Sequence, residues 1–453
     1  MVRRREFLLG LGSGLAAAAG CSAPVTDGRT ETTAADSTTT EATATAERST
    51  TAGEPTTRST TRQTTTAGSD SANWPMYGFD AAHTGYNPEA TGPAGPVSAV
   101  WQRGMPGATR TTAPAVVDGA VFVANVWEGI CFDADTGDIA WRTDTGTYNS
   151  FHSPGVADGT VYIAGRYRDA GEEGLVTRDL TVPGALTALS AEDGSVRWTR
   201  ETHISSSPVI HGGRVYYTAM DGNGGGAVRA VDPTDGSDLW GSAFEGDLPV
   251  ARVTEPAVAD GTVYVTLAHK TKGRAGRVVA LSAADGTRQW AVRTDAKLFS
   301  APSVADGTVY AVSTTGGVYA LDADDGTEQW RASPGVNRAV DVPPTVAEGT
   351  VFVGGRDGVA ALDAADGSTR WTHGMSLSLT TPAIADGTLY LGGDRVAALS
   401  TADGAEQWTF VNEGFHSAYA GPTVTDGTVH VTTCIKEEAG DLYDHAVVAL
   451  RGE

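Results

Sequence analysis

One internal repeat accounts for most of this 453-residue chain. Each copy opens on a proline, continues with two short apolar runs joined by a turn, and in most cases closes on Asp-Gly-x-x-x-Trp. Such a period indicates an architecture in which each unit buries its apolar face against its neighbours. The opening prolines are Pro114, Pro154, Pro208, Pro256, Pro302, Pro344, Pro382 and Pro422. The closing tryptophans are Trp141, Trp198, Trp240, Trp290, Trp330, Trp371 and Trp408.

Each copy has the pattern of four short β-strands. Runs such as 309–312 are rich in β-branched and aromatic residues and are bounded by turn signals. The first Asp-Gly pair of a copy, as in Asp306-Gly307, is a two-residue hairpin signal, because both central positions need a positive φ. The second pair, as in Asp325-Gly326, begins the turn into the tryptophan-bearing strand. Four strands per unit predict a propeller blade.

The eighth copy indicates how the ring closes. It begins at Pro422, and the sequence reaches Glu453 without a tryptophan-bearing strand. A matching strand, 97–102, lies ahead of the first copy and carries Trp101. We therefore predict an all-β, eight-bladed β-propeller of four-stranded blades. Its N-terminal strand would complete the last blade and remove the open edge of the ring.

The closing segments carry a family resemblance. Residues 320–330 read ALDADDGTEQW, and residues 74–80, at the start of the repeat region, read WPMYGFD. Both resemble the PQQ-type (quinoprotein-like) propeller repeat family, whose docking motif ends in tryptophan. The resemblance covers residues 74–453. It implies that Trp101 and the seven closing tryptophans are structural residues packed between neighbouring blades.

Two segments ahead of the ring are expected to lie outside it. Residues 1–21 contain a twin-arginine pair, a Gly/Ala/Leu stretch and small residues ahead of Cys21. They resemble a twin-arginine export signal with lipidation at Cys21, the alternative being an uncleaved buried helix. Residues 22–72 are Thr/Ser-rich and too poor in large apolar residues to fold, so they predict a disordered stalk, glycosylated or plain. The propeller then occupies 73–453, and the protein is expected to be lipid-anchored on the outer side of the cytoplasmic membrane.

Charge excludes some partners. Lys and Arg total 32 against 55 Asp and Glu, which gives a net charge of −23. Such a surface repels phosphate backbones, so no nucleic-acid partner is expected. The acid-rich, lysine-poor composition resembles that of haloarchaeal proteins. The longest apolar stretch is N-terminal and too short to span a bilayer comfortably, so membrane attachment is expected through the lipid anchor alone.

A candidate binding face follows from strand order. Both Asp-Gly turns of a blade lie on one face and are short, whereas the variable connections, such as 166–184 and 434–445, lie on the opposite face. Basic residues precede several opening prolines on that side and should reach the rim of the channel. They are Arg110, His152, Arg252, Lys297, Arg338 and His416, with His203 in a similar position. They suggest an anionic ligand or acidic peptide; the alternative is a solvated rim partly neutralised by Glu255 and Asp341.

Two cysteines remain after Cys21. Cys131 and Cys434 fall in the first and eighth units, which should be neighbours across the ring closure. A disulfide could therefore staple the closure. The alternative is that Cys131 is a small core residue, since other copies have alanine at its position.

Two functions remain open. The first is a non-catalytic, surface-anchored scaffold that binds a protein partner or a small ligand on the loop-rich face, as some PQQ-type propellers do. The second, implied by the same resemblance, is a PQQ- and calcium-dependent dehydrogenase of an alcohol or sugar. No catalytic set and no metal site can be placed on a motif. The acidic run at 437–445 has the pattern of a solvated loop, the alternative being a metal-binding loop. Glycan binding is a third possibility, which rests on location and the Tyr and His of the rim.

Overall fold

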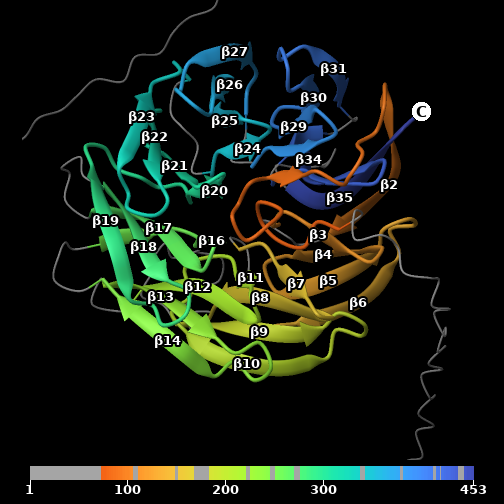
Figure 1. Cartoon of the computed structure of the whole chain (residues 1–453). Coiled ribbons are helices and arrows are strands. Elements are labelled where there is room, and N and C mark those ends of the chain that lie inside the picture. The colour runs from red at the N-terminus through yellow and green to blue at the C-terminus, as the bar shows by residue number, and fades with distance from the viewer. Residues whose placement is uncertain are drawn as a thin grey trace, which may run out of the picture. The chain divides into compact units, whose positions relative to one another are not determined.

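The computed structural model describes residues 73–105, 111–147, 152–167, 183–220, 225–244, 250–269, 276–336, 342–377, 381–411, 415–418, 420–436 and 443–453. These residues form eight β-sheets arranged as a ring (Figure 1). The predicted all-β, eight-bladed propeller is confirmed. Among the described residues there is no helix with the length and the apolar character needed to span a bilayer.

Each blade has four antiparallel strands, which in blades 1 to 7 run from the channel outwards in chain order. Blades 1 to 4 comprise β3 (Ala115–Val117), β4 (Ala120–Ala124), β5 (Glu128–Asp133) and β6 (Ile139–Asp144); β7 (Gly155–Ala157), β8 (Thr160–Arg166), β9 (Gly184–Ser190) and β10 (Val196–Thr202); β11 (Val209–His211), β12 (Arg214–Met220), β13 (Gly226–Val231) and β14 (Asp238–Ala243); β16 (Ala257–Ala259), β17 (Thr262–His269), β18 (Gly276–Ser282) and β19 (Arg288–Thr294).

Blades 5 to 7 comprise β20 (Ser303–Ala305), β21 (Thr308–Val312), β22 (Val318–Asp322) and β23 (Glu328–Ala332); β24 (Thr345–Ala347), β25 (Thr350–Gly355), β26 (Gly358–Asp363) and β27 (Thr369–Gly374); β28 (Ala383–Ala385), β29 (Thr388–Gly392), β30 (Val396–Ser400) and β31 (Glu406–Phe410). Blade 8 comprises β33 (Thr423–Thr425), β34 (Thr428–Lys436), β35 (Tyr443–Gly452) and β2 (Val97–Met105). Three short strands extend these sheets: β1 (Tyr86–Asn87), β15 (Val250–Val253) and β32 (Phe415–Ala418).

The inner hairpins have the backbone that their sequence predicts. Asp306 has a φ of 48° and Gly307 a φ of 70°, and the other inner Asp-Gly turns of blades 1, 2, 4 and 7 likewise have two positive values. Blade 6 uses Glu348 at the first of these positions, with a φ of 47°. Glycine at the second position tolerates this conformation without strain, so the turn matches the twist of its two strands.

Tryptophan joins each blade to the next. The indole nitrogen of Trp290 donates to the carbonyl of Ala323 in the following blade at 2.9 Å, and the ring lies against Gly326. A Cβ on Gly326 would lie 2.8 Å from that ring, so only glycine permits the contact. Equivalent indole hydrogen bonds are made by Trp101, Trp141, Trp198, Trp240, Trp330 and Trp371. Each bond bridges two sheets that share no backbone pairing.

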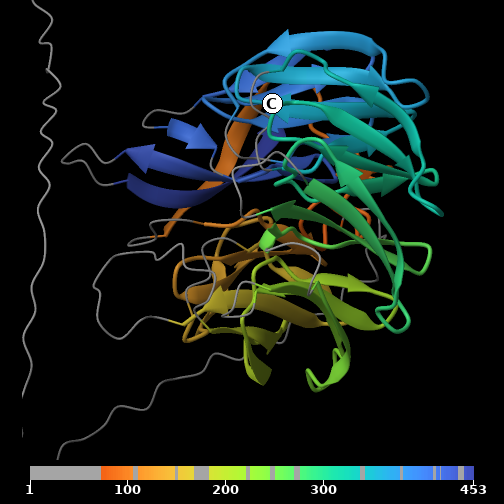
Figure 2. The same ribbon diagram turned by 90° about the vertical axis from the view of Figure 1, so that its left-hand side faces the viewer.

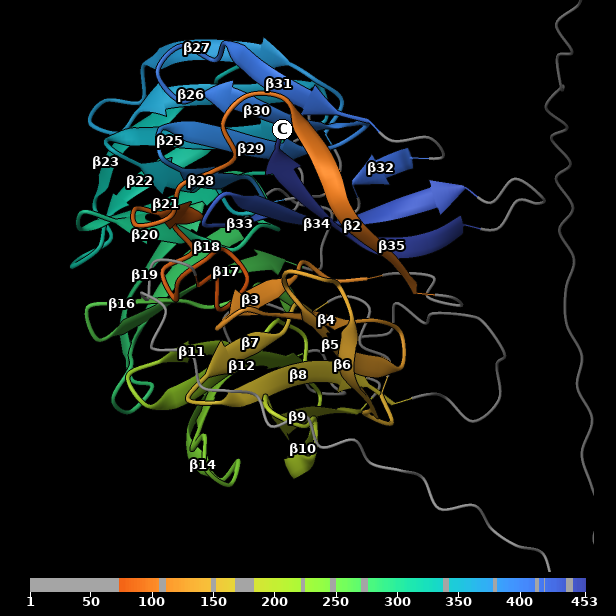
Figure 3. The same ribbon diagram turned by 90° about the vertical axis from the view of Figure 1, so that its right-hand side faces the viewer.

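Blade 8 closes the ring as predicted. β2 pairs antiparallel with β35, and Trp101 lies opposite Ala449 (Figure 3). At one end of this pair the amide of Glu453 donates to the carbonyl of Pro96 at 3.0 Å. In the other blades the third and fourth strands are joined by the turn that begins at the second Asp-Gly or Thr-Gly pair, here called the docking turn. Blade 8 has no such turn, because its fourth strand comes from the start of the ring. Trp408 of blade 7, which faces that seam, is buried with no partner for its indole nitrogen.

Residues 73–96, here called the lead-in, cross the centre of the ring (Figure 1, orange-red). In six blades the central residue of the innermost strand donates its amide to a lead-in carbonyl. The order follows the chain: Val116 to Trp74, Val156 to Pro75, Val258 to Ala81, Val304 to Ala82, Val346 to Thr84 and Ile384 to Gly85, at 2.6 to 2.9 Å. The innermost strands would otherwise present unpaired edges to the channel, and the lead-in satisfies them.

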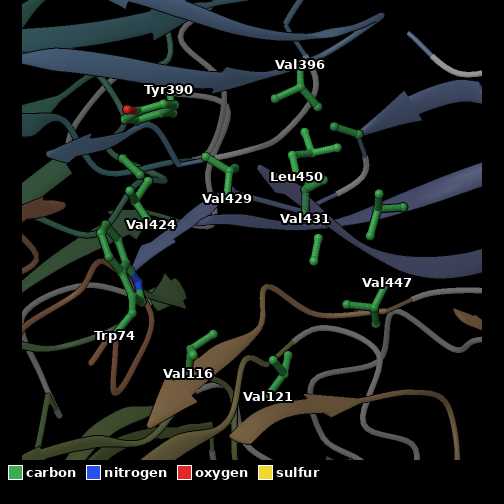
Figure 4. Close-up of a cluster of buried hydrophobic side chains, with 14 of the residues drawn as sticks. Trp74, Val116, Val121, Tyr390, Val396, Val424, Val429, Val431, Val447 and Leu450 are labelled. Carbon is green, nitrogen blue, oxygen red and sulfur yellow. The ribbon is translucent and has the colours of Figure 1, made fainter. Parts of the chain in front are cut away.

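The hydrophobic core is divided among the interfaces between blades. The largest cluster joins blades 7, 8 and 1 and includes Trp74 of the lead-in together with Val121, Tyr390 and Leu450 (Figure 4). Further clusters lie between the other neighbouring blades. The seam with the non-covalent closure thus has ample apolar contact of its own.

The structure contains no disulfide between Cys131 and Cys434. Cys131 packs with Val156, Val161 and Leu189, so it faces blade 2. Cys434 lies in β34 of blade 8, on the other side of blade 1. The bridge that the sequence left open is therefore not formed, because the two cysteines face different interfaces.

Candidate binding face at the channel mouth

The two faces of the ring differ in construction. The Asp-Gly turns and the docking turns lie on one face, here called the turn face, and they are short and uniform. The connections from second to third strands and from blade to blade lie on the other, the loop-rich face. β34 and β35, with nine and ten residues, are the longest second and third strands of any blade, and they project beyond the ring together with β2 and β32 (Figures 2 and 3).

The lead-in lies toward the turn face. The side chain of Asn73 accepts the amide of Asp118, in an inner turn, at 2.9 Å. The carbonyl of Thr91 accepts the amide of Gly427, in the inner turn of blade 8, at 2.9 Å. Side chains that precede the innermost strands approach the channel from the opposite, loop-rich side. A ligand of those side chains would therefore approach from that side.

A hydroxyl group two residues before the proline recurs around the rim. Thr112, Ser206, Thr254 and Ser300 occupy this position in blades 1, 3, 4 and 5. Each hydroxyl bonds to the second strand of its own blade: the amide of Thr218 donates to Ser206 Oγ at 2.8 Å, and Ser300 Oγ donates to the carbonyl of Val312 at 3.2 Å. These bonds attach the approaching chain to the blade.

Blade 2 has His152 at this position. The imidazole is only 5% exposed, and its Nδ1 has no hydrogen-bond partner. Burial, and to a smaller extent the charges of Arg166 and Arg252, together lower the pKa of His152 to about 3. The ring is therefore neutral at physiological pH and lies within electrostatic reach of two guanidinium groups.

The other predicted rim residues occupy a common position. In blades 3, 4 and 5 one residue of the approaching chain pairs with the end of the second strand: Ile204 with Ala219, Val253 with Leu267 and Leu298 with Ser313. The predicted rim residue is the one directly before it, namely His203, Arg252 or Lys297. All three side chains are partly exposed. Lys297 Nζ lies 6.0 Å from the centre of the Phe299 ring. His416 lies in β32.

Several predicted positions fall outside the described residues. These are Arg110, Arg338, Asp341, Cys21 and the whole of 1–72, together with 437–442. Arg166 was missed as a site residue because it ends a strand rather than preceding a proline. Its signal in the sequence was its place at the start of the longest variable connection, 166–184.

The described part of the chain offers no metal centre. No group of three or more His, Cys, Asp or Glu side chains among the described residues is placed to hold a metal ion. Calcium takes oxygen ligands from carboxylates, from amide and backbone carbonyls and from water.

Comparison with known proteins sets this geometry in a family. Three overlapping stretches, residues 98–216, 224–376 and 328–451, match the PQQ-repeat family described as outer membrane protein assembly factor BamB. The chain belongs to this family. It is 28% identical over 202 residues to the outer membrane protein assembly factor BamB of Yersinia pestis, and the match covers 41% of this chain and 46% of that protein. The aligned part is thus less than half the length of this curated BamB.

Solved structures share the fold with BamB and with quinoprotein enzymes. BamB from Moraxella catarrhalis superposes with a TM-score of 0.56 at 18% identity, over 78% of this chain and 97% of that one. A quinohemoprotein alcohol dehydrogenase from Pseudomonas putida gives 0.64 at 14% identity, over 84% and 80%. A europium-containing methanol dehydrogenase gives 0.66 at 11% identity, over 84% and 98%. These identities establish a common architecture and do not separate a scaffold from an enzyme.

Proposed function

We propose that the protein is a non-catalytic binding scaffold that engages a protein partner or a ligand through its loop-rich face. The asymmetry of the two faces carries this proposal. The turn face is uniform and has the lead-in across its centre, whereas the loop-rich face carries the variable connections, the tall strands of blade 8 and the buried imidazole of His152. Variation concentrated on one face of a repeat fold is typical of a binding surface.

The alternative function is dehydrogenation with PQQ and calcium. The cofactor would supply a quinone that accepts the electrons of an alcohol, and Arg252 and Lys297 are the described rim residues that could hold its carboxylates. The described residues supply no acidic metal ligands in a group, so no catalytic step is derived for them. The scaffold function needs only the surface that the blades present.

The location proposed for this scaffold follows from the N-terminal sequence. We propose export by the twin-arginine route, lipidation at Cys21 and display of the ring on the outer side of the cytoplasmic membrane through the 22–72 stalk. The curated relative is named for assembly at an outer membrane, which is consistent with a membrane-associated partner.

Site-specific photocrosslinking on intact cells tests the scaffold function. A photoreactive amino acid would replace Thr315 or Asp394, which are exposed on the loop-rich face of blades 5 and 7. The matched controls replace Asp325 and Asp403, which are exposed in docking turns of the same two blades. We expect a discrete crosslinked species from the first pair and none from the second.

A parallel assay separates the two functions. Purified protein would be mixed with PQQ and calcium and assayed for quinone absorbance and for dye reduction with a panel of alcohols and sugars. Dye reduction above the protein-free control would replace the scaffold function with the dehydrogenase. Crosslinking from all four positions alike, or from none, would contradict a binding role for the loop-rich face.

A further inference from the structure

The position two residues before the proline carries no hydroxyl in three blades: it is Val342 in blade 6, Ala420 in blade 8 and His152 in blade 2. Where blades 1, 3, 4 and 5 use a small hydroxyl that bonds to the neighbouring strand, blade 2 has a buried imidazole whose Nδ1 has no partner. An unsatisfied buried polar atom destabilises the folded protein. Nothing in the described part of the protein satisfies Nδ1 of His152, so this atom is a candidate to bond a ligand.

Blade 3 connects His152 to Arg252. The amide of Ser153 donates to Ser207 Oγ in the approach to blade 3 at 3.0 Å. On the far side, β15 of blade 4, which contains Arg252, packs against β12 and β13 of blade 3. Arg166 ends β8, the second strand of the same blade as His152, on the loop-rich side. His152 therefore lies within electrostatic reach of a guanidinium group from its own blade, Arg166, and of one from blade 4, Arg252.

We propose that His152, Arg166 and Arg252, here called the basic trio, form a binding site for a carboxylate group at the loop-rich mouth of the channel. This proposal rests on the proposed function and names the chemistry of the ligand that the loop-rich face takes. The carboxylate belongs to a small acid or to an acidic peptide of a partner. Glu255 follows Arg252 by three residues and adds one negative charge to the chain that approaches blade 4.

The chemistry of the basic trio suits a carboxylate. A guanidinium group presents parallel N–H donors that match the two oxygens of a carboxylate. A neutral imidazole adds a directional hydrogen bond without a further charge, and its low pKa keeps it neutral. The rest of the surface repels anions, since the net charge is −23. The ligand is therefore held by short-range contacts and not by the field of the whole protein.

Calorimetric titration of the purified full-length protein tests the site. The probes are succinate, a penta-glutamate peptide and inorganic phosphate, at low ionic strength. We expect saturable binding of succinate or of the peptide, and weaker binding of phosphate. Arg252→Gln and Arg166→Gln should each lower the affinity at least about tenfold, as expected for the loss of a charge-assisted hydrogen bond. Arg293→Gln is the matched control, because Arg293 is exposed on the outer strand β19 of the same blade as Arg252.

His152→Ser is the decisive variant. It installs the residue that blade 3 has at this position, so the thermal midpoint should stay within a few degrees while carboxylate affinity falls at least about tenfold. Wild-type affinity in His152→Ser and in both arginine variants would overturn the proposal, as would no binding of succinate and peptide or equally strong binding of phosphate. Succinate binding confined to the wild type and Arg293→Gln supports a small acid, and peptide binding with the same dependence supports an acidic segment of a partner.

The two experiments fail independently. Titration uses purified protein with defined probes, and crosslinking uses cells with an unidentified partner. Loss of the carboxylate site would leave a crosslinked partner in place, and absence of a crosslink would leave the titration intact.

Discussion

The indole nitrogen of Trp101 donates to the carbonyl of Ala134 at 2.8 Å. Trp101 lies in β2, the outer strand of blade 8, and Ala134 lies in the docking turn of blade 1. This contact therefore joins the last blade to the first. The strand that makes it, β2, belongs to blade 8 but comes before blade 1 in the sequence. It has the same geometry as the contact between Trp290 and Ala323 in the middle of the ring. The closure of the ring is thus as well docked on that side as any covalently continuous junction.

Docking glycines should be far less replaceable than hairpin glycines. Gly286 has a φ of 73°, and a Cβ there would lie 2.5 Å from the Trp240 ring. Gly307 has a φ of 70°, and a Cβ there would meet nothing within 4 Å. We expect Gly307→Ala to cost about 1–2 kcal/mol through backbone strain alone. Gly286→Ala should cost about 2–4 kcal/mol, because the indole must also move.

Denaturant unfolding of the two glycine variants measures this difference. Both changes add one methyl group at a positive φ, so each is the control for the other. Equal loss of stability in the two variants would show that the indole contact does not require glycine.

Trp408 should tolerate loss of its indole nitrogen better than Trp330. Trp330 donates to the carbonyl of Ala364 at 2.8 Å, whereas Trp408 Nε1 is buried without a partner. Tryptophan-to-phenylalanine substitution removes the same atoms at both sites. We expect Trp330→Phe to be more destabilising by about 1 kcal/mol, because it leaves a partly buried carbonyl without its donor. Thermal or denaturant unfolding of the two variants gives the comparison, and a larger loss in Trp408→Phe would contradict it.

Stability should fall as the pH drops below about 6.5. Burial lowers the pKa of His83 and of His430 to about 4. The unfolded chain binds protons at these groups from about pH 6.5 downwards, and the folded chain does not until about pH 4. Each group thus contributes stability that is present above pH 6.5 and lost as the pH falls towards 4, amounting to about 3 kcal/mol at pH 4.

His430→Tyr separates this effect from general acid denaturation. His430 stands on the second strand of blade 8 where blades 2, 3, 4, 5 and 7 have tyrosine, for example Tyr264. The variant should lose less stability than the wild type between pH 6.5 and pH 4, measured by denaturant unfolding at each pH. A parallel pair of stability curves would refute the assignment to His430.

Removal of the lead-in should destabilise the whole ring. Deletion of 73–85 uncovers the amides of the innermost strands, such as Val258 and Val346, and removes Trp74 from the largest core cluster. We expect a lower thermal midpoint and faster limited proteolysis. Deletion of 22–72 is the control and should leave the midpoint unchanged, because that segment has almost no large apolar residues to bury. Equal midpoints for the two deletions would show that the lead-in adds no stability.

The repeat made the fold predictable, because each strand and turn signal recurs. A copy with a weak signal can be assigned from the position of the same strand or turn in the other copies. The strand at 97–102 could be assigned to blade 8 because Trp101 has the spacing of the docking series. The path of the lead-in could not be predicted, since its bonds to the blades use backbone carbonyls that carry no signature in the side chains.

The rim was less predictable than the ring. Counting residues before each proline brought Arg252, His203 and Lys297 into one group, and the strand pairing gives them one position. The convergence of Arg166 on His152 depends on the length and direction of strands in blade 2, which a spacing rule does not contain. Alternate side chains of β5 face opposite neighbouring blades, and Cys131 is on the side that faces blade 2. The neighbouring positions of blades 1 and 8 were therefore not enough to pair Cys131 with Cys434.

The lead-in has a consequence for how the chain folds. It lies first in the sequence, yet its hydrogen-bond partners extend as far as Ile384 and Gly427. β2 likewise can pair only after β35 has been synthesised, and β35 ends at Gly452. The full set of edge-covering bonds and the last sheet cannot be complete before nearly the whole polypeptide is available. Contacts of such long sequence separation slow folding, so early blades must persist with open edges until the end of synthesis. The propeller should therefore fold late and all at once, and it should depend on protection of its unfinished blades in the meantime.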